Sequence, residues 1–182
     1  MLHTLVILVE DKPGVLNRVA SLFRRRAFNI ESLTVGHTDT EGLSRMTVTV
    51  EGDDLHIERL TSYLYKLVNV IQVEDLTEKQ MVSRDLALIK VSTVTEKRAE
   101  IFQMVEVFRA RVIDVTSTSL IIEVTGDGSK IDGFVDVLKP LGIIEMVRTG
   151  AVAMERGSES LVNPANGMRD FSEAMYETVP SI

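Results

Sequence analysis

Residues 10–16 read E-D-K-P-G-V-L and mark the point at which a buried strand is expected to give way to a helix. The residues before them, 5–9, form an unbroken apolar run that is typical of a central strand covered on both faces. After them, apolar residues recur with helical spacing and place one stripe on a helix over residues 14–26. That stripe contains Val15, Leu16, Val19, Leu22 and Phe23.

The polar part of this junction offers a helix cap and a place for an anion. Asp11 is a good N-cap candidate, Pro13 suits the first helical position, and Gly14 allows another group to approach the backbone closely. Unpaired N–H groups and the positive end of the helix dipole favour a small carboxylate at such a point. Taken alone, however, a D-x-P-G stretch is most often only a turn followed by a cap.

The first 78 residues predict a βαββαβ unit. The apolar parity changes between Ile30 and Leu33, which indicates a bulge or an edge strand, and T-D-T-E-G at 38–42 predicts a hairpin. Alternation in the third strand is expected to point Met46, Val48 and Val50 inward and Thr47, Thr49 and Glu51 outward. The second helix should bury Ile57, Leu60, Leu64 and Leu67. Strands are expected over 3–9, 28–37, 43–51 and 70–76, and helices over 14–26 and 54–68.

The same order of elements recurs after a polar linker at 79–84, so the sequence predicts an α+β fold of two consecutive ferredoxin-like units. Expected apolar stripes are Ile101, Met104, Val105 and Phe108 on one helix, and Ile131, Phe134, Val135 and Leu138 on the other. The stretch G-D-G-S-K at 126–130 lacks the spacing of a phosphate-binding loop and predicts a strand-to-helix turn. Strands are expected over 86–94, 112–115, 120–125 and 143–147, and helices over 96–109 and 129–139.

Composition excludes several classes of function. The absence of cysteine excludes disulfides and thiolate metal sites, and His3, His37 and His56 lack the spacing of metal ligands. The net charge of −7 argues against nucleic-acid binding, and the basic run at 24–26 fits a solvated helix end better than an anion or partner site. No apolar run reaches the roughly 18 residues of a membrane span, and no signal peptide is visible, so a cytoplasmic location is expected.

Three stretches together carry a resemblance to a known family. They are E-D-K-P-G-V-L at 10–16, F-N-I-E-S-L-T-V at 28–35 and L-S-R-M-T-V-T-V at 43–50. This combination resembles the ACT-domain regulatory subunits of acetohydroxyacid (acetolactate) synthase, closely over residues 1 to about 80 and also in the second half. The resemblance implies an amino-acid-sensing ACT domain at 1–78, a C-terminal ferredoxin-like regulatory domain at 85–157 and a flexible tail at 158–182.

The family role implied by this resemblance is regulatory. Such subunits activate a catalytic large subunit and make it sensitive to valine, while thiamine diphosphate, magnesium and FAD belong to the catalytic partner. Their ACT domains pair side by side as a homodimer and bind a branched-chain amino acid between the first loop of one copy and the Asn29-Ile30 segment of the other. Many relatives carry Asn where this chain has Asp11, so that side chain either contacts the ligand or only caps the helix. The matching positions are Asp11, Lys12, Gly14, Val15, Leu16, Asn29 and Ile30.

The residues that other proteins with this fold need for their functions are missing from this sequence. An acylphosphatase-type enzyme needs an arginine in the first loop, which offers only Lys12, and no nucleophile–base pair is evident. An RNA-binding relative would place aromatic rings on its central strands, which here carry aliphatic residues and threonine. We therefore expect no intrinsic enzyme activity, no cofactor and no metal in this chain. The alternative is a free-standing ACT protein that regulates transcription or another enzyme, although no helix-turn-helix is visible.

Overall fold

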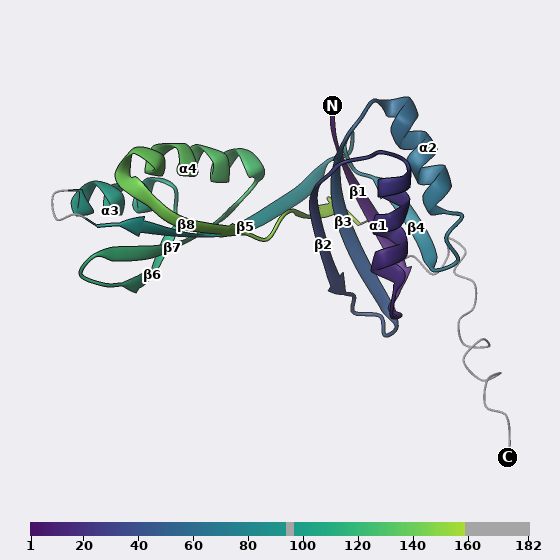
Figure 1. Cartoon of the computed structure of the whole chain (residues 1–182), viewed down its shortest axis with the longest axis horizontal. Helices are drawn as coiled ribbons and strands as arrows, with labels where there is room; N and C mark the ends of the chain where they lie inside the picture. The colour runs from purple at the N-terminus through teal and green to yellow at the C-terminus, as the bar shows by residue number, and fades with distance from the viewer. Residues whose placement is uncertain (94–96, 159–182) are drawn as a thin grey trace, which may run out of the picture.

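The computed structural model describes residues 1–93 and 97–158. The expected strand end at Val94, the expected helix start at Glu96 and residues 159–182 of the expected tail lie outside these residues. Within them the chain forms two α+β units, each with the predicted βαββαβ order (Figure 1). The predicted fold class is therefore confirmed.

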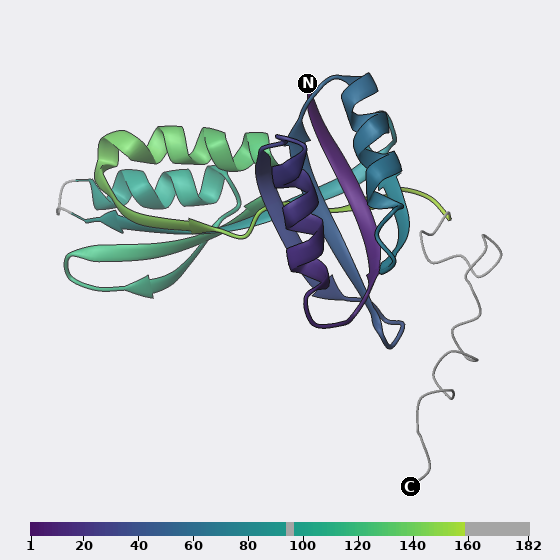
Figure 2. The same cartoon turned by 45° about the vertical axis from the view of Figure 1, so that its right-hand side comes forward.

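The first unit forms a four-stranded sheet in the order β2-β3-β1-β4, with both of its helices on one face (Figure 2). Residues on this face of the sheet, such as Leu5 and Ile7, pack with residues of the helices, such as Phe23, and together they make the larger core of the unit. Its elements are β1 (Leu2–Glu10), α1 (Val15–Arg25), β2 (Ile30–His37), β3 (Leu43–Glu51), α2 (Asp54–Leu64) and β4 (Val70–Asp75).

The junction between β1 and α1 differs from the prediction. The helix begins at Val15, and the N-cap is Gly14, whose φ of 83° lies in the left-handed region and which has no side chain to cap with. The chain enters the helix through this glycine conformation, so Pro13 precedes the first turn and Asp11 does not reach the helix N–H groups. The expected cap at Asp11 and the expected helical position of Pro13 are both wrong.

The bulge and the hairpin of the first unit are confirmed. Pairing between β2 and β3 shifts register between Ile30 and Ser32, and β2 is an edge strand of the sheet. The hairpin at 38–42 ends at Gly42, whose φ of 78° requires glycine or a strained residue. The outward positions of β3 are only partly as predicted, because Thr47 and Thr49 are just 3% and 8% exposed. Another segment of the chain therefore covers the face of this sheet that is turned away from its helices.

The second unit forms the sheet β6-β7-β5-β8 with α3 and α4 on one face, and a further strand, β9, pairs with β5 outside that order. Asp127 caps α4 by accepting a hydrogen bond from the Lys130 N–H, so the turn predicted at 126–130 is confirmed. The elements are β5 (Met81–Ser92), α3 (Arg98–Val107), β6 (Arg111–Val115), β7 (Ser119–Gly126), α4 (Gly128–Gly142), β8 (Ile143–Arg148) and β9 (Val152–Glu155).

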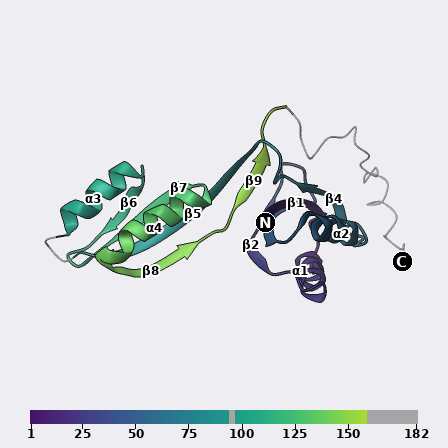
Figure 3. The same cartoon turned by 90° about the horizontal axis from the view of Figure 1, so that it is seen from above.

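Two expectations about this second half are wrong. Strand β5 begins at Met81 rather than at residue 86, so residues 81–84, assigned to the linker, belong to a strand. No strand was expected after the one at 143–147, but β9 follows it and pairs with residues 81–84 of β5 (Figure 3). Each of these short segments lacks a continuous apolar pattern, and each is a strand because the other supplies its hydrogen-bonding partner. In the described part of the chain, no helix is long and apolar enough to cross a membrane.

Candidate functional site

The loop between β1 and α1 is held by contacts to the neighbouring hairpin. The Asp11 N–H donates to the Gly42 carbonyl at 2.7 Å, and the Asp11 carboxylate lies 3.2 Å from His37 Nδ1 at the end of β2. Lys12 Nζ lies 3.2 Å from the Glu10 carboxylate. Both Asp11 and Lys12 are exposed, so their side chains remain accessible to a ligand or a partner.

The start of α1 presents an open, positively polarised end. A Cβ built on Gly14 would meet no atom of the described residues within 4 Å, so the described part of one chain leaves the space in front of this residue open. Helix starts leave backbone N–H groups without intrahelical acceptors, and here the N–H groups of Leu16 and Asn17 have no backbone acceptor among residues 1–93 and 97–158. A carboxylate near this end would be stabilised by about 0.3–1 kcal/mol through the helix dipole.

The predicted aliphatic residues of the site, and Val35 near them on β2, differ in how far they are buried. Val15 is 3% exposed and belongs to the core of the first unit, so its side chain faces away from solvent. Leu16 and Val35 are 43% and 44% exposed, and Ile30 is partly buried against the core. Exposed aliphatic side chains beside an open helix end are suited to contact a small aliphatic group.

Asn29 and Ile30 lie at the other end of the helix from Gly14. Strands β1 and β2 both run antiparallel to β3, so they are parallel to each other, and the start of β2 lies beside the start of β1. Helix α1 has 11 residues, so the two groups of predicted site residues are separated by roughly 16 Å along its axis. One chain therefore brings Asp11, Lys12 and Gly14 together but does not bring Asn29 to them.

A partly buried polar network behind the loop was not predicted from the sequence. Asn69, only 7% exposed, donates through Nδ2 to Glu10 Oε2 at 2.5 Å and accepts from Arg18 at 2.5 Å. Burial raises the pKa of Glu10, but the hydrogen bonds from Asn69 and Lys12 lower it more, so the pKa lies below its ordinary value. This network joins the end of β1, α1 and the residue before β4. No local pattern signals it, because Asn69 lies 59 residues from Glu10.

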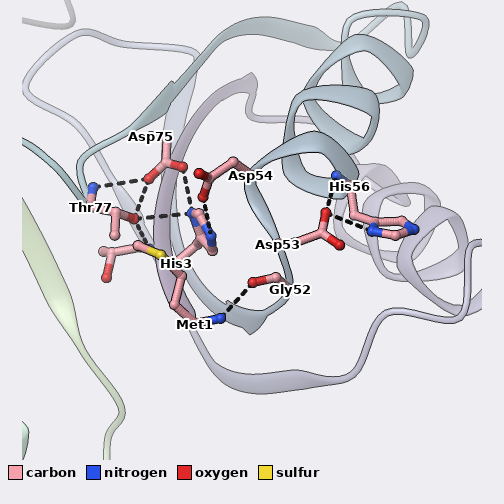
Figure 4. Close-up of polar contacts among 9 residues, drawn as sticks. Met1, His3, Gly52, Asp53, Asp54, His56, Asp75 and Thr77 are labelled. Atoms are coloured by element: carbon pink, nitrogen blue, oxygen red, sulfur yellow. Dashed lines mark hydrogen bonds and ion pairs between the residues drawn. The ribbon is translucent and has the colours of Figure 1, made fainter.

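A second polar cluster lies around His3, near the start of β1 (Figure 4). His3 is 3% exposed, and its Nδ1 lies 2.8 Å from Asp75 Oδ2, while Asp75 also accepts hydrogen bonds from the backbone and side chain of Thr77. His3 Nε2 lies 3.5 Å from Asp54 Oδ1 at the start of α2. The cluster joins β1, β4 and α2. Among residues 1–93 and 97–158, no three histidine or acidic side chains are placed to hold a metal ion.

Comparison with known proteins covers both units of the chain. Residues 5–72 match the family model described as the AHAS small subunit-like ACT domain, and residues 84–157 match the model described as the small subunit of acetolactate synthase. A probable acetolactate synthase small subunit of Archaeoglobus fulgidus is 54% identical over 159 residues, which are 87% of this chain and 99% of that protein. The acetolactate synthase small subunit of Mycobacterium leprae is 49% identical over 87% of this chain and 94% of its own length.

A solved structure agrees with both the sequence and the fold. The crystal structure of the acetolactate synthase small subunit of Thermotoga maritima has a TM-score of 0.81 and 45% identity, and the match covers 87% of this chain and 99% of that one. The resemblance seen at 10–16, 28–35 and 43–50 therefore extends through both units. The chain belongs to the acetolactate synthase small subunit family, and its first unit is the ACT domain of that family.

Proposed function

We propose that this chain activates the catalytic large subunit of an acetolactate synthase and makes it sensitive to feedback inhibition by valine. Membership of the small-subunit family supports a regulatory role and a catalytic partner. A free-standing ACT regulator is disfavoured, because a family model of the small subunit also matches residues 84–157. Thiamine diphosphate, magnesium and FAD would be bound by the catalytic subunit, and this chain would carry out no chemistry itself.

The proposed effector site lies between two copies of the ACT domain. The observation that carries this proposal is that Gly14 and Asn29 lie at opposite ends of α1, so neither end of one chain forms a complete site. In a side-by-side dimer, the amino acid's carboxylate would bind the open start of α1 in one copy, and Asn29 of the other would bind a charged group of the ligand. Leu16, Ile30 and Val35 would contact its aliphatic side chain.

The edge strand β2 is suited to form this dimer. Within the described chain it pairs only with β3, so its outer backbone groups are free to pair with a second strand. We propose that β2 of one copy lies beside β2 of another and extends the sheet across the dimer. The functional division into an ACT domain at 1–78, a second regulatory domain at 85–157 and a tail remains part of this proposal, whereas residues 81–84 of the expected linker belong to β5.

Reconstitution tests the proposal. The purified chain is mixed with the catalytic subunit, and acetolactate formation is measured with each protein alone, with both together, and with both plus valine. We expect no turnover of pyruvate by this chain, more activity in the mixture than in the catalytic subunit alone, and inhibition by valine only in the mixture. Turnover by this chain alone, or equal activity of the catalytic subunit with and without it, would contradict the proposal.

A further inference from the structure

The segment just before β9 lies against the face of the first sheet that is turned away from its helices. Ser32 Oγ accepts a hydrogen bond from the Ala151 N–H at 3.0 Å, and Thr34 Oγ1 donates to the Ala151 carbonyl at 2.7 Å. Arg45 donates to the Ala153 carbonyl at 2.7 Å. Both hydrogen-bonding groups of the Ala151 backbone are therefore held by one strand, β2.

Packing around this segment is close. Ala153 is 5% exposed and packs with apolar residues of the first unit, so it covers the second face of the sheet. Gly150 has a φ of 88°, and a Cβ added to it would collide with Ser32 Oγ. Residues 150–153 thus rest on β2 and β3 with no room for a larger side chain at Gly150. The apolar residues packed with Ala153 are Val6, Leu8, Leu43 and Leu76.

The same segment continues directly into the second unit. Residues 152–155 form β9, which pairs with residues 81–84 of β5, and β5 then runs on as a central strand of the second sheet (Figure 3). Lys79 Nζ also lies 3.0 Å from Glu155 Oε2. A displacement of β2 that moves Ala151 would therefore also move β9 and, through their pairing, β5.

Two of the proposed effector residues, Asn29 and Ile30, lie at the start of β2, which begins at Ile30. Asn29 and Ile30 precede Ser32 by two or three positions, and the register shift of β2 lies between them and Ser32. Ser32 and Thr34 pair with Thr49 and Thr47, so their side chains lie on the face opposite the helices. The Asn29 amide donates to the Glu31 carboxylate, so a ligand that binds Asn29 competes with a contact inside the bulge.

We infer that Ser32 and Thr34 couple the effector site to the second unit by holding Ala151, so that amino-acid binding at Asn29 is transmitted to the second sheet through residues 150–155. This inference rests on the proposed function and concerns its regulation. Allosteric coupling requires a contact that differs between the free and the bound state, and the two hydrogen bonds to Ala151 connect β2 directly to the segment that leads into β9.

The test compares two substitutions with matched controls. Ser32→Ala removes the acceptor for the Ala151 N–H, and Ser62→Ala removes an exposed hydroxyl on α2. Gly150→Ala adds a Cβ that collides with Ser32, whereas Gly157→Ala adds a Cβ at a similarly positive φ with nothing within 4 Å. Valine binding is measured by calorimetry for the free chain and for its complex with the catalytic subunit, and acetolactate formation is measured with and without saturating valine.

We expect Ser32→Ala and Gly150→Ala to bind valine within about 2-fold of wild type, while the ratio of activity without and with valine falls about 5-fold. By reciprocity, the catalytic subunit should then change valine affinity less than it does in wild type. Both controls should behave as wild type. If Gly150→Ala does not fold, Ser32→Ala alone decides.

Full valine inhibition in the folded Ser32→Ala variant would overturn the coupling role. Loss of valine binding in that variant would overturn it too, because Ser32 would then shape the site rather than transmit its occupancy. A wild-type complex that valine does not inhibit would refute the proposed function itself, and the coupling role with it. The wild-type titration therefore separates failure of the function from failure of the coupling.

Discussion

Gly14 and Asn29 lie at opposite ends of helix α1. Gly14 is the N-cap of this helix, and Asn29 lies three residues beyond its C-cap at Arg26. Because the two residues are separated by the length of the helix, an effector that touches both must lie between two chains. Each dimer would then hold two sites, and each site would combine Gly14 of one copy with Asn29 of the other.

This arrangement predicts complementation between two defective chains. Gly14→Asp should abolish valine binding and Asn29→Ala should weaken it about 10- to 150-fold, but a mixed dimer contains one site with both native residues. After equal amounts are mixed and subunits exchange, about a quarter of the wild-type sites should return, because half of the dimers are mixed and one of their two sites is intact. Calorimetry measures the number of sites. Continued absence of binding in a mixture shown to contain mixed dimers would rule out a shared site.

We predict that Gly14→Asp separates sensing from activation. The new carboxylate would repel the ligand's carboxylate at the start of α1, while the positive φ costs the fold about 1–2 kcal/mol at a position where no described atom lies within 4 Å. The variant should still activate the catalytic subunit, and valine should no longer inhibit the complex. Gly157→Asp is the control, because it introduces the same charge at a similar φ far along the chain. Joint loss of activation and inhibition would mean that Gly14 serves the fold or the partner contact.

Asn29→Ala should weaken valine binding without unfolding the chain. Asn29 is exposed and contributes nothing to the core, so the loss is one hydrogen bond to a charged ligand group. Such a bond contributes about 1.5–3 kcal/mol, which corresponds to about 10- to 150-fold in affinity. Valine titration of the reconstituted complex measures the shift. Gln103→Ala, which removes an exposed amide on α3, should leave valine inhibition unchanged.

Arg148→Met should destabilise the second unit strongly. Arg148 Nε donates to Asp85 Oδ2 at 2.5 Å, and Asp85 is only 5% exposed, so the substitution leaves a buried carboxylate without its partner. The expected cost is about 3–5 kcal/mol in the free energy of unfolding. Lys139→Met removes an exposed partner of Asp136 and should cost about 1 kcal/mol or less. Urea unfolding of both variants checks the difference, and equal costs would mean that the buried pair adds no stability.

The polar cluster at His3 predicts a loss of stability in acid. Burial raises the pKa of Asp75, but the hydrogen bonds from Thr77 and His3 lower it more, so its pKa in the folded chain lies below the ordinary value. This contribution is complete above the unfolded pKa of about 3.9 and is lost as pH falls through the lower folded pKa. Asp75→Asn should cost about 1–3 kcal/mol at pH 7.

The dependence of stability on pH distinguishes the loss of the Asp75 carboxylate from a general decrease in the stability of the fold. Stability of Asp75→Asn, measured by urea unfolding, should fall less steeply than wild type below about pH 4, because the titrating group is gone. Asp39→Asn, an exposed position in the hairpin, should keep the wild-type profile. Parallel profiles for wild type and Asp75→Asn would contradict the role of Asp75.

The sequence by itself determined the order of elements and the faces they bury. The apolar run at 5–9, the stripe from Val15 to Phe23 and the parity change after Ile30 are local patterns, and each reports which side of an element is buried. The run at 5–9 even required cover on both faces, because alternate residues of a strand point to opposite sides. The same patterns, read as a resemblance, also led to the family.

Tertiary structure decided what the local patterns could not specify. Strand β9 and the first residues of β5 exist as strands because they pair with each other across about 70 residues of chain, and Ala153 then covers Val6 and Leu8. Likewise, the N-cap of α1 is Gly14 rather than Asp11, because the chain enters the helix through a left-handed backbone conformation at Gly14. Periodicity records that a side chain is buried, but the identity of its cover depends on contacts between distant segments, which only the folded chain brings together.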